Sequence, residues 1–109
     1  MSQRVAKVES LIQQLVARAL VEQLERDAAA VTVTRVDSSP DLKNAVVWIG
    51  MLGKANSQDQ IWAHIERKKG DLQAAVADAM STKFVPRLHF KRDSGGEYAA
   101  EIDRLLRQI

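Results

Sequence analysis

The 109-residue sequence contains no cysteine, which excludes disulfides, thiolate zinc sites and cysteine nucleophiles. Aromatic residues make up only 5% of the chain, so few side chains are available to stack on bases. No apolar run approaches the roughly 20 residues that a membrane span needs, and the N-terminus lacks the basic-then-apolar layout of a signal peptide. We therefore expect a cytoplasmic protein with one domain spanning residues 1–109.

The net charge is only +2, but the charges are unevenly distributed along the chain. Residues 67–92 carry seven basic and two acidic side chains, whereas residues 1–30, 31–66 and 93–109 are neutral or acidic in sum. A local excess of cations is the usual electrostatic footprint of binding to a phosphate backbone. A solvated helix face is the alternative interpretation.

Residues 31–53 are predicted to form two strands joined by a tight turn. Val31 and Val33 alternate with threonines, the period-two pattern of a half-buried strand. The turn, Ser-Ser-Pro-Asp over residues 38–41, includes Asp41, whose side chain is expected to cap the nearby backbone. In the second strand, three residues are expected to face the flanking helices: Ala45, Val47 and Ile49.

Helices are predicted on both sides of these strands. Apolar residues spaced by three and four predict a helix over residues 4–26. Its buried face is expected to comprise Val5, Val8, Leu11, Ile12, Leu15, Val16, Ala19, Leu20 and Leu24. Ser57 and Gln60 form a capping-box pattern, so a second helix is expected to begin there. Gly70 is expected to break this second helix with a left-handed C-cap, giving a sharp kink before another helical segment.

The last part of the chain predicts a third strand and a short final helix. Leu88 and Phe90 are expected to point into the core, while the side chains between them point to the opposite face. A second capping box, Ser94 with Glu97, predicts a C-terminal helix. Its apolar face would comprise Tyr98, Ile102, Leu105, Leu106 and Ile109. The predicted fold class is α+β, with a mixed three-stranded sheet covered by helices on one face.

This order of elements, and the residues within it, resemble the ribosome-binding factor A family, which has a type II KH fold. The matching residues, in chain order, are Arg4-Val5, Val31-Thr32-Val33-Thr34, Val36, Ser39, Asp41-Leu42, Ala45, Gly70-x-Leu72, Pro86-x-Leu88-x-Phe90 and Asp93. The chain departs from the family's pattern at Lys68, where the family has alanine, and at Gln73, where it commonly has arginine. Asp71 also brings a negative charge to this segment.

The resemblance implies an α-β-β-α-kink-α-β domain that binds the immature small (30S) ribosomal subunit. It implies contact with 16S rRNA near the 5′-terminal helix, with small-subunit ribosomal proteins as further partners. The protein would assist rRNA processing and late subunit maturation, notably in the cold, as a monomer without a cofactor.

RNA contact is expected from basic residues around the predicted kink and elsewhere in the chain. Because a helix N-terminus favours phosphates, cations beside a new helix start would be well placed to bind them. The candidate RNA-binding residues are Arg67, Lys68, Lys69, Gly70, Arg4, Lys7, Lys83, Arg87, Lys91 and Arg92.

Other classes of function remain as alternatives. The two histidines, His64 and His89, lie on different elements, and no Walker-type, HExxH or dinucleotide-binding motif occurs, so we expect no enzyme and no metal site. A generic KH-like RNA-binding module is one alternative. The other is a protein-interaction module anchored by Val46 and Trp48 on the outer face of the sheet, unless the chain itself covers them.

Overall fold

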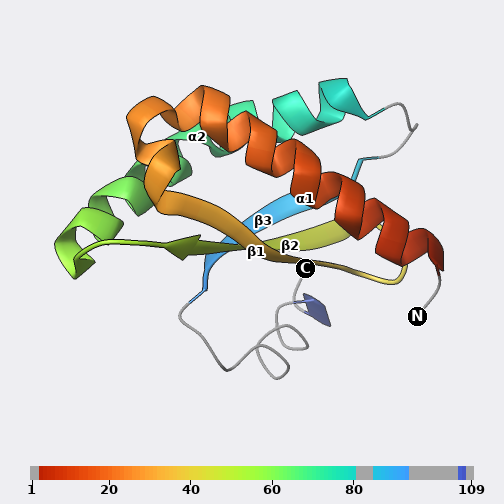
Figure 1. Ribbon diagram of the computed structural model, residues 1–109. Coiled ribbons are helices and arrows are strands. Elements are labelled where there is room, and N and C mark those ends of the chain that lie inside the picture. Colours follow the sequence, from red (N-terminus) through yellow and green to blue (C-terminus); the bar gives the residue numbers. More distant parts are fainter. Residues whose placement is uncertain (1–2, 81–84, 94–105, 108–109) are drawn as a thin grey trace.

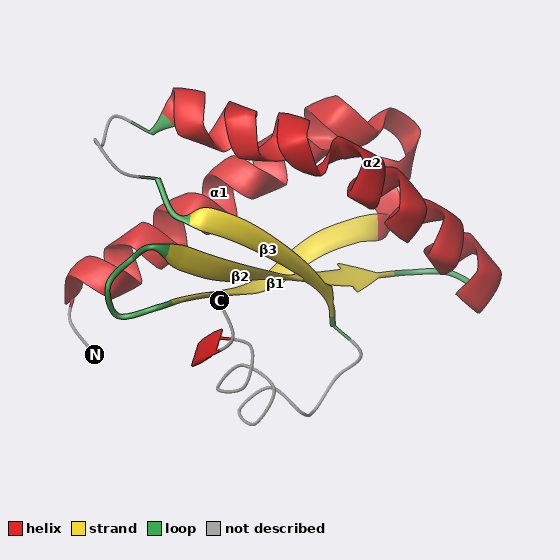
Figure 2. Ribbon diagram, turned by 180° about the vertical axis from the view of Figure 1, so that it is seen from behind, coloured by secondary structure: helices red, strands yellow, loops and turns green. Residues whose placement is uncertain are grey.

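The computed structural model describes residues 3–80, 85–93 and 106–107. Its elements, in chain order, are α1 (Gln3–Leu24), the 3-10 helix η1 (Glu25–Ala30), β1 (Val31–Ser38), β2 (Asn44–Met51), α2 (Ala55–Ala79) and β3 (Arg87–Arg92). The three strands form one sheet in the order β1-β2-β3, in which β2 is antiparallel to β1 and parallel to β3. Both helices lie on the same face of this sheet (Figure 1 and Figure 2). The predicted α+β architecture is confirmed.

Helix α1 follows the predicted apolar stripe closely. Ile12, Val16 and Leu24 are almost completely buried and join the core with residues of the sheet and α2. Leu11 is the exception, since 38% of its surface is exposed and it lies outside the buried face. The helix ends at Leu24 because Glu25 adopts a left-handed backbone conformation, with φ of 53°, and the chain continues into η1.

Strand β1 contains a bulge that the alternation of valine and threonine does not reveal. Val33 pairs with Ile49, but Arg35 rather than Thr34 pairs with Trp48. The extra residue resets the alternation, so Val33 and Val36 both point into the core although they are three positions apart. Two α1 side chains then bind the backbone of β1: Gln13 donates to the Val33 carbonyl (3.1 Å), and Glu9 accepts from the Ser38 N–H (2.7 Å).

The turn between β1 and β2 is organised by Ser39 and Asp41, as predicted. The Ser39 hydroxyl donates to the Asp41 carboxylate (2.7 Å) and accepts from the Asn44 N–H (3.1 Å), while the Lys43 N–H donates to the same carboxylate (3.1 Å). The Ser39 hydroxyl, and next the Lys43 N–H, hold the pKa of Asp41 below its usual value. Leu42 takes a left-handed conformation (φ 59°) that lets the chain reverse.

Strand β2 carries apolar side chains to both faces of the sheet. Ala45, Val47 and Ile49 are fully buried in the core beneath the helices, as predicted. Val46 (0% exposed) and Trp48 (3% exposed) lie on the other face and are covered by the chain itself. The interpretation of this pair as an exposed anchor for another protein is therefore wrong.

The structure of helix α2 contradicts two predictions. It begins at Ala55, with Lys54 at the N-cap position and no side-chain cap, so Ser57 does not form the predicted capping box. It is also helical without interruption from Ala55 to Ala79, so the predicted break at Gly70 is wrong. The ribbon of α2 does change direction as it passes over the sheet (Figure 2), but Gly70 has no left-handed conformation there.

Strand β3 confirms the predicted inward and outward alternation. Leu88 and Phe90 are buried in the core, whereas Arg87 is exposed and His89 and Lys91 are half-buried. The Ser94–Glu97 capping box and most of the predicted C-terminal helix lie outside the described residues. The described pair from that segment, residues 106 and 107, is helical.

Ser39→Ala should lower the free energy of unfolding by about 1–2 kcal/mol at neutral pH, because the Asn44 N–H loses its acceptor and Asp41 loses one of its two donors. Since the pKa of Asp41 is lowered in the folded state, the Asp41 contribution is present above the ordinary value of 3.8 and is lost as pH falls through the lowered pKa. Urea denaturation of both proteins across this pH range measures the difference.

Ser57→Ala is the matched control. Within the described residues, the α2 N-terminus has no side-chain cap, so the effect of Ser57→Ala should stay within about 0.5 kcal/mol. A loss of about 1 kcal/mol or more for Ser57→Ala would support the predicted capping box instead. An unchanged free energy of unfolding for Ser39→Ala would contradict the hydrogen-bond network of the turn.

Candidate nucleic-acid interface

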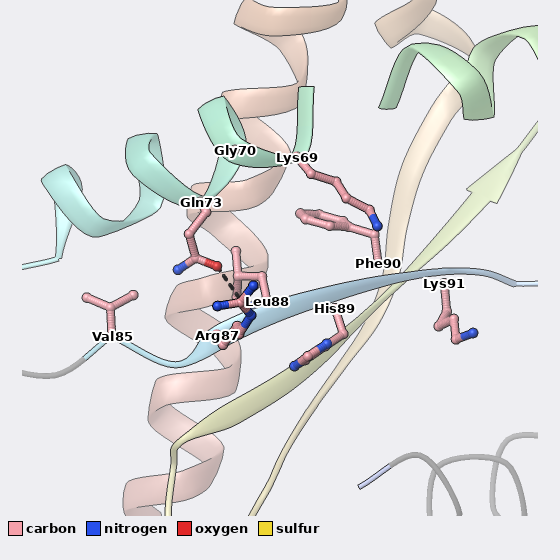
Figure 3. Close-up of a pocket in the computed structure, with 9 residues that line it drawn as sticks. All are labelled: Lys69, Gly70, Gln73, Val85, Arg87, Leu88, His89, Phe90 and Lys91. Atoms are coloured by element: carbon pink, nitrogen blue, oxygen red, sulfur yellow. Dashed lines mark hydrogen bonds between the residues drawn. The ribbon is translucent and has the colours of Figure 1, made fainter. Parts of the chain in front are cut away.

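A hollow of about 640 Å³ lies between the middle of α2 and the edge of β3. It is lined by Lys69, Gly70, Gln73, Val85, Arg87, Leu88, His89, Phe90 and Lys91 (Figure 3). Residues from two elements therefore meet here although they are well separated in the sequence. The hollow lies within residues 67–92, the segment that carries the excess of basic side chains.

The sheet topology produces this hollow. Among the described residues, β3 pairs with β2 alone, so its second side is an open edge there, and α2 passes beside it as the crossover between two parallel strands. The Arg87 N–H donates to the Lys43 carbonyl (2.9 Å) and the Asp93 N–H donates to the Ile49 carbonyl (2.7 Å). Odd-numbered residues of β3 thus bond to β2. The backbone groups of even-numbered residues, including Leu88 and Phe90, face the open edge.

Three cations reach the hollow from both elements. Arg87 and Lys91 lie on β3, two positions before and two positions after His89. Because side chains alternate between the two faces of a strand, all three residues share one face. Lys69 extends from α2 toward β3 (Figure 3). Its ammonium lies 2.8 Å from the Glu66 carboxylate, in an exposed pair one helical turn apart that is worth only a few tenths of a kcal/mol, on the order of 0.3–0.5. Lys69 therefore stays available to an anion.

His89 lies among these cations. Its Nε2 is 3.0 Å from the Asn44 Oδ1 on β2, so in the neutral ring this nitrogen carries the proton and donates. Burial, and then the charges of Arg87, Lys69 and Lys91, lower the pKa of His89 from the ordinary 6.5. The free protein therefore holds His89 neutral near pH 7, and a bound anion would oppose the shift by offsetting the three cations.

Gly70 lines the hollow next to Lys69 and does not end a helix there. A Cβ added at Gly70 would meet no atom within 4 Å, so neither the packing nor the backbone conformation demands glycine here. The missing side chain leaves room for a ligand backbone to approach α2 closely. Loss of the helix break also removes the predicted helix N-terminus as a source of phosphate affinity.

The predicted basic residues divide into separate groups. Lys69, Arg87 and Lys91 line the hollow, whereas Arg67 and Lys68 project from other sides of α2, since consecutive helical residues point in different directions. Arg4 and Lys7 are exposed at the start of α1 and do not line the hollow. Arg92 pairs with Asp59 (2.8 Å) and lies 6.0 Å from the centre of the Trp62 ring. Lys83 lies outside the described residues.

Two lining or supporting residues had no role in the sequence-based prediction. Asn44 holds the His89 ring, and Gln73 binds the backbone of β3 through both ends of its carboxamide. Neither contact has a local sequence signal, because each joins positions 13 or more residues apart. The sequence marks Gln73 solely as a departure from the family's arginine.

Other kinds of site are not evident in the part of the chain that the structure describes. There, no three metal-ligating side chains of His, Asp or Glu lie together. The helices within residues 3–80 are too short or too polar to cross a membrane.

The fold and the hollow define a KH-like α+β protein with a cationic groove at the open edge of its sheet. The family model of ribosome-binding factor A matches residues 4–106 of the chain. A ribosome-binding factor A of Thermomicrobium roseum is 38% identical over 79 residues, which make up 72% of this chain and 61% of that protein. The chain belongs to the ribosome-binding factor A family.

Solved structures agree with this assignment. The solution structure of a Thermotoga maritima protein described as a putative ribosome binding factor A has a TM-score of 0.72 and is 31% identical, covering 91% of this chain and 95% of that one. A homology model of the Thermus thermophilus ribosome binding factor A, as fitted into an electron cryo-microscopy map of a 30S complex, has a TM-score of 0.62 at 22% identity. That match covers 84% of this chain and 99% of the Thermus chain, and it supports the fold.

Gly70→Ala should raise the free energy of unfolding by about 0.5–1 kcal/mol, because alanine favours a helix and nothing obstructs its methyl group. Thermal or urea denaturation checks the sign. Gly53→Ala is the control: Gly53 has a φ of 102°, so alanine there should destabilise the protein. A loss of stability in both variants would indicate a left-handed conformation at Gly70 and would contradict the structure.

Proposed function

We propose that this chain binds the immature small ribosomal subunit by holding 16S rRNA in the hollow between α2 and β3. The observation that carries the proposal is that Lys69 of α2, and Arg87 and Lys91 on the other face of β3, line one hollow at an open strand edge beside a glycine. Cations supply phosphate affinity, and the bare helix surface at Gly70 admits a backbone at close range. Membership of the ribosome-binding factor A family is what suggests the identity of the RNA.

Recognition through the RNA backbone and shape suits the composition of the hollow. The lining has two aromatic rings, Phe90, which is buried in the core, and the half-buried imidazole of His89, so base stacking has little surface to use. Lysine ammonium groups act as point charges toward phosphate, and the Arg87 guanidinium can bind two phosphate oxygens. We therefore expect affinity to depend strongly on salt and weakly on base sequence.

A homology model of the Thermus thermophilus relative has been fitted into a map of its complex with the 30S subunit. By extension to this chain, the contact would lie near the 5′-terminal helix of 16S rRNA, with small-subunit ribosomal proteins beside it. The protein would act in the cytoplasm as a monomer, without catalysis or cofactor. It would occupy and shape a precursor RNA site during rRNA processing and late maturation, notably at low temperature.

Replacing Lys69 and Lys91 together by glutamine should weaken binding to precursor small subunits by about 10- to 50-fold, because two phosphate contacts are lost. The slope of log affinity against log salt should become shallower by about 1.5 units, at roughly 0.7–0.9 per contact. Co-sedimentation with purified precursor and mature subunits at several salt concentrations measures both effects.

Arg18→Gln with Arg26→Gln is the matched control, since it removes the same charge from exposed helical positions outside the hollow. Its affinity should fall by less than about threefold. Equal losses in the two double variants would mean that net charge alone drives binding. Equal sedimentation with precursor and mature subunits would favour a generic RNA-binding module over a maturation factor.

RNA affinity should rise as the pH falls from about 7.5 to about 5.5. The pKa of His89 is low in the free protein because of burial and of Arg87, Lys69 and Lys91. A bound polyanion offsets these charges and raises that pKa, so the complex takes up a proton that the free protein does not hold. Oligouridine is the suitable ligand, because uracil itself does not titrate in this range.

His89→Gln should flatten the pH profile while retaining most of the affinity near pH 7.5, where His89 is neutral in the free protein. His64→Gln is the control, since His64 pairs with Asp27 at a distance from the hollow and should leave the profile unchanged. An identical pH dependence in wild type and His89→Gln would place the bound phosphates away from His89.

A further inference from the structure

Gln73 makes a two-ended contact with the edge of β3. Its Oε1 accepts from the Leu88 N–H at 2.8 Å, and its Nε2 donates to the Pro86 carbonyl at 3.1 Å. Figure 3 shows the Gln73 side chain descending from α2 onto β3, with its bond to Leu88 dashed. The contact is half-buried and joins the two elements that form the hollow.

This contact copies the hydrogen bonds of a parallel strand. In a parallel ladder, one residue of the neighbouring strand donates to a carbonyl and accepts from the N–H two residues further along. Pro86 and Leu88 present such a carbonyl and N–H on either side of Arg87. The Gln73 carboxamide carries the same donor and acceptor as a peptide group, so it takes the place of one residue of a fourth strand.

We propose that Gln73 is a positioning residue that closes the Pro86–Leu88 part of the β3 edge and directs the bound RNA strand to the Phe90–Arg92 part. This inference rests on the proposed function. Along β3, the next backbone groups that face the open edge are those of Phe90 and Arg92, which flank the cation Lys91. Lys69 and Gly70 line the same hollow from α2.

Charge and hydrogen bonding favour this division of the edge. A ligand at Pro86–Leu88 would first have to break two bonds of normal length, whereas at Phe90–Arg92 it meets backbone donors together with Lys69 and Lys91. Closing part of an edge strand with a side chain also prevents unwanted strand pairing. Gln73 therefore determines which part of the β3 edge is open to the RNA strand.

The closure can be tested without RNA, by amide hydrogen exchange measured by NMR. In Gln73→Met, which keeps the side-chain volume but removes both bonds, exchange of the Leu88 amide should accelerate at least about tenfold. The Lys91 amide, which faces β2, should keep its protection. Gln60→Met, an exposed position on the same helix, is the matched control and should change neither amide. Unchanged Leu88 exchange in Gln73→Met would overturn the closure.

The directing role is tested by titrating 15N-labelled wild-type protein with a short oligouridine. The amides of Phe90 and Arg92 should shift while that of Leu88 stays in place, and in Gln73→Met the Leu88 amide should join them. Leu88 shifting as strongly as Phe90 in the wild type would overturn the role of Gln73 alone. Absence of any shift along β3 would overturn the proposed RNA site together with it. The wild-type titration decides the matter even if Gln73→Met does not fold.

Discussion

The parallel pairing of β2 with β3 is the constraint on which the rest of the structure depends. Two parallel neighbours cannot be joined by a tight turn, so the chain must cross over the sheet, and α2 makes that crossing. The same pairing leaves β3 at the edge, with half of its backbone groups directed away from β2. A helix beside an open strand edge is what creates the hollow.

The electrostatics of the hollow depend on this geometry more than on the total charge of the protein. Lys69 comes from α2, while Arg87 and Lys91 come from alternate positions of β3. Together with burial, which is the larger cause, their charges lower the pKa of His89. The bond from His89 to Asn44 ties the cluster to β2. A protein with a net charge of +2 can therefore present a strongly cationic site, provided that its fold brings distant cations together.

At both edges of the sheet, glutamine side chains from the overlying helices form hydrogen bonds to backbone groups of the edge strand. Gln13 of α1 donates to the Val33 carbonyl at the β1 edge, and Gln73 of α2 engages β3 in two directions. Open strand edges invite pairing with other chains, and polar side chains from a covering helix limit that risk. The difference between the two edges is that cations and a glycine line the hollow beside β3.

Periodicity in the sequence predicts the elements and their inward faces, because burial imposes a spacing of three to four on α1 and of two on β2 and β3. Contacts between elements have no such local signal. The bulge at Thr34, the left-handed Glu25 and the Asn44–His89 bond arise from tertiary packing. The prediction at Gly70 is wrong because glycine occurs within helices as well as at their ends, although it costs about 0.5–1 kcal/mol there relative to alanine. The sequence alone does not distinguish the two positions.

Similarly, a run of consecutive cations is conspicuous in a sequence, but a helix turns them in different directions. Lys69 lines the hollow and Arg67 does not, whereas the cations spaced by two on β3 share one face. Strand spacing is therefore the better guide to the site. Family resemblance points to the segment, and the sheet topology explains which of its residues line one hollow.

The measurement that tests the central claim most directly is a reconstruction, by electron cryo-microscopy, of this chain bound to a precursor of the small ribosomal subunit. We expect the rRNA backbone to lie against Lys69 and Gly70 and along the Phe90–Arg92 edge of β3. RNA seated on the β1 edge, or on the outer face of the sheet, with the α2–β3 hollow empty, would contradict it.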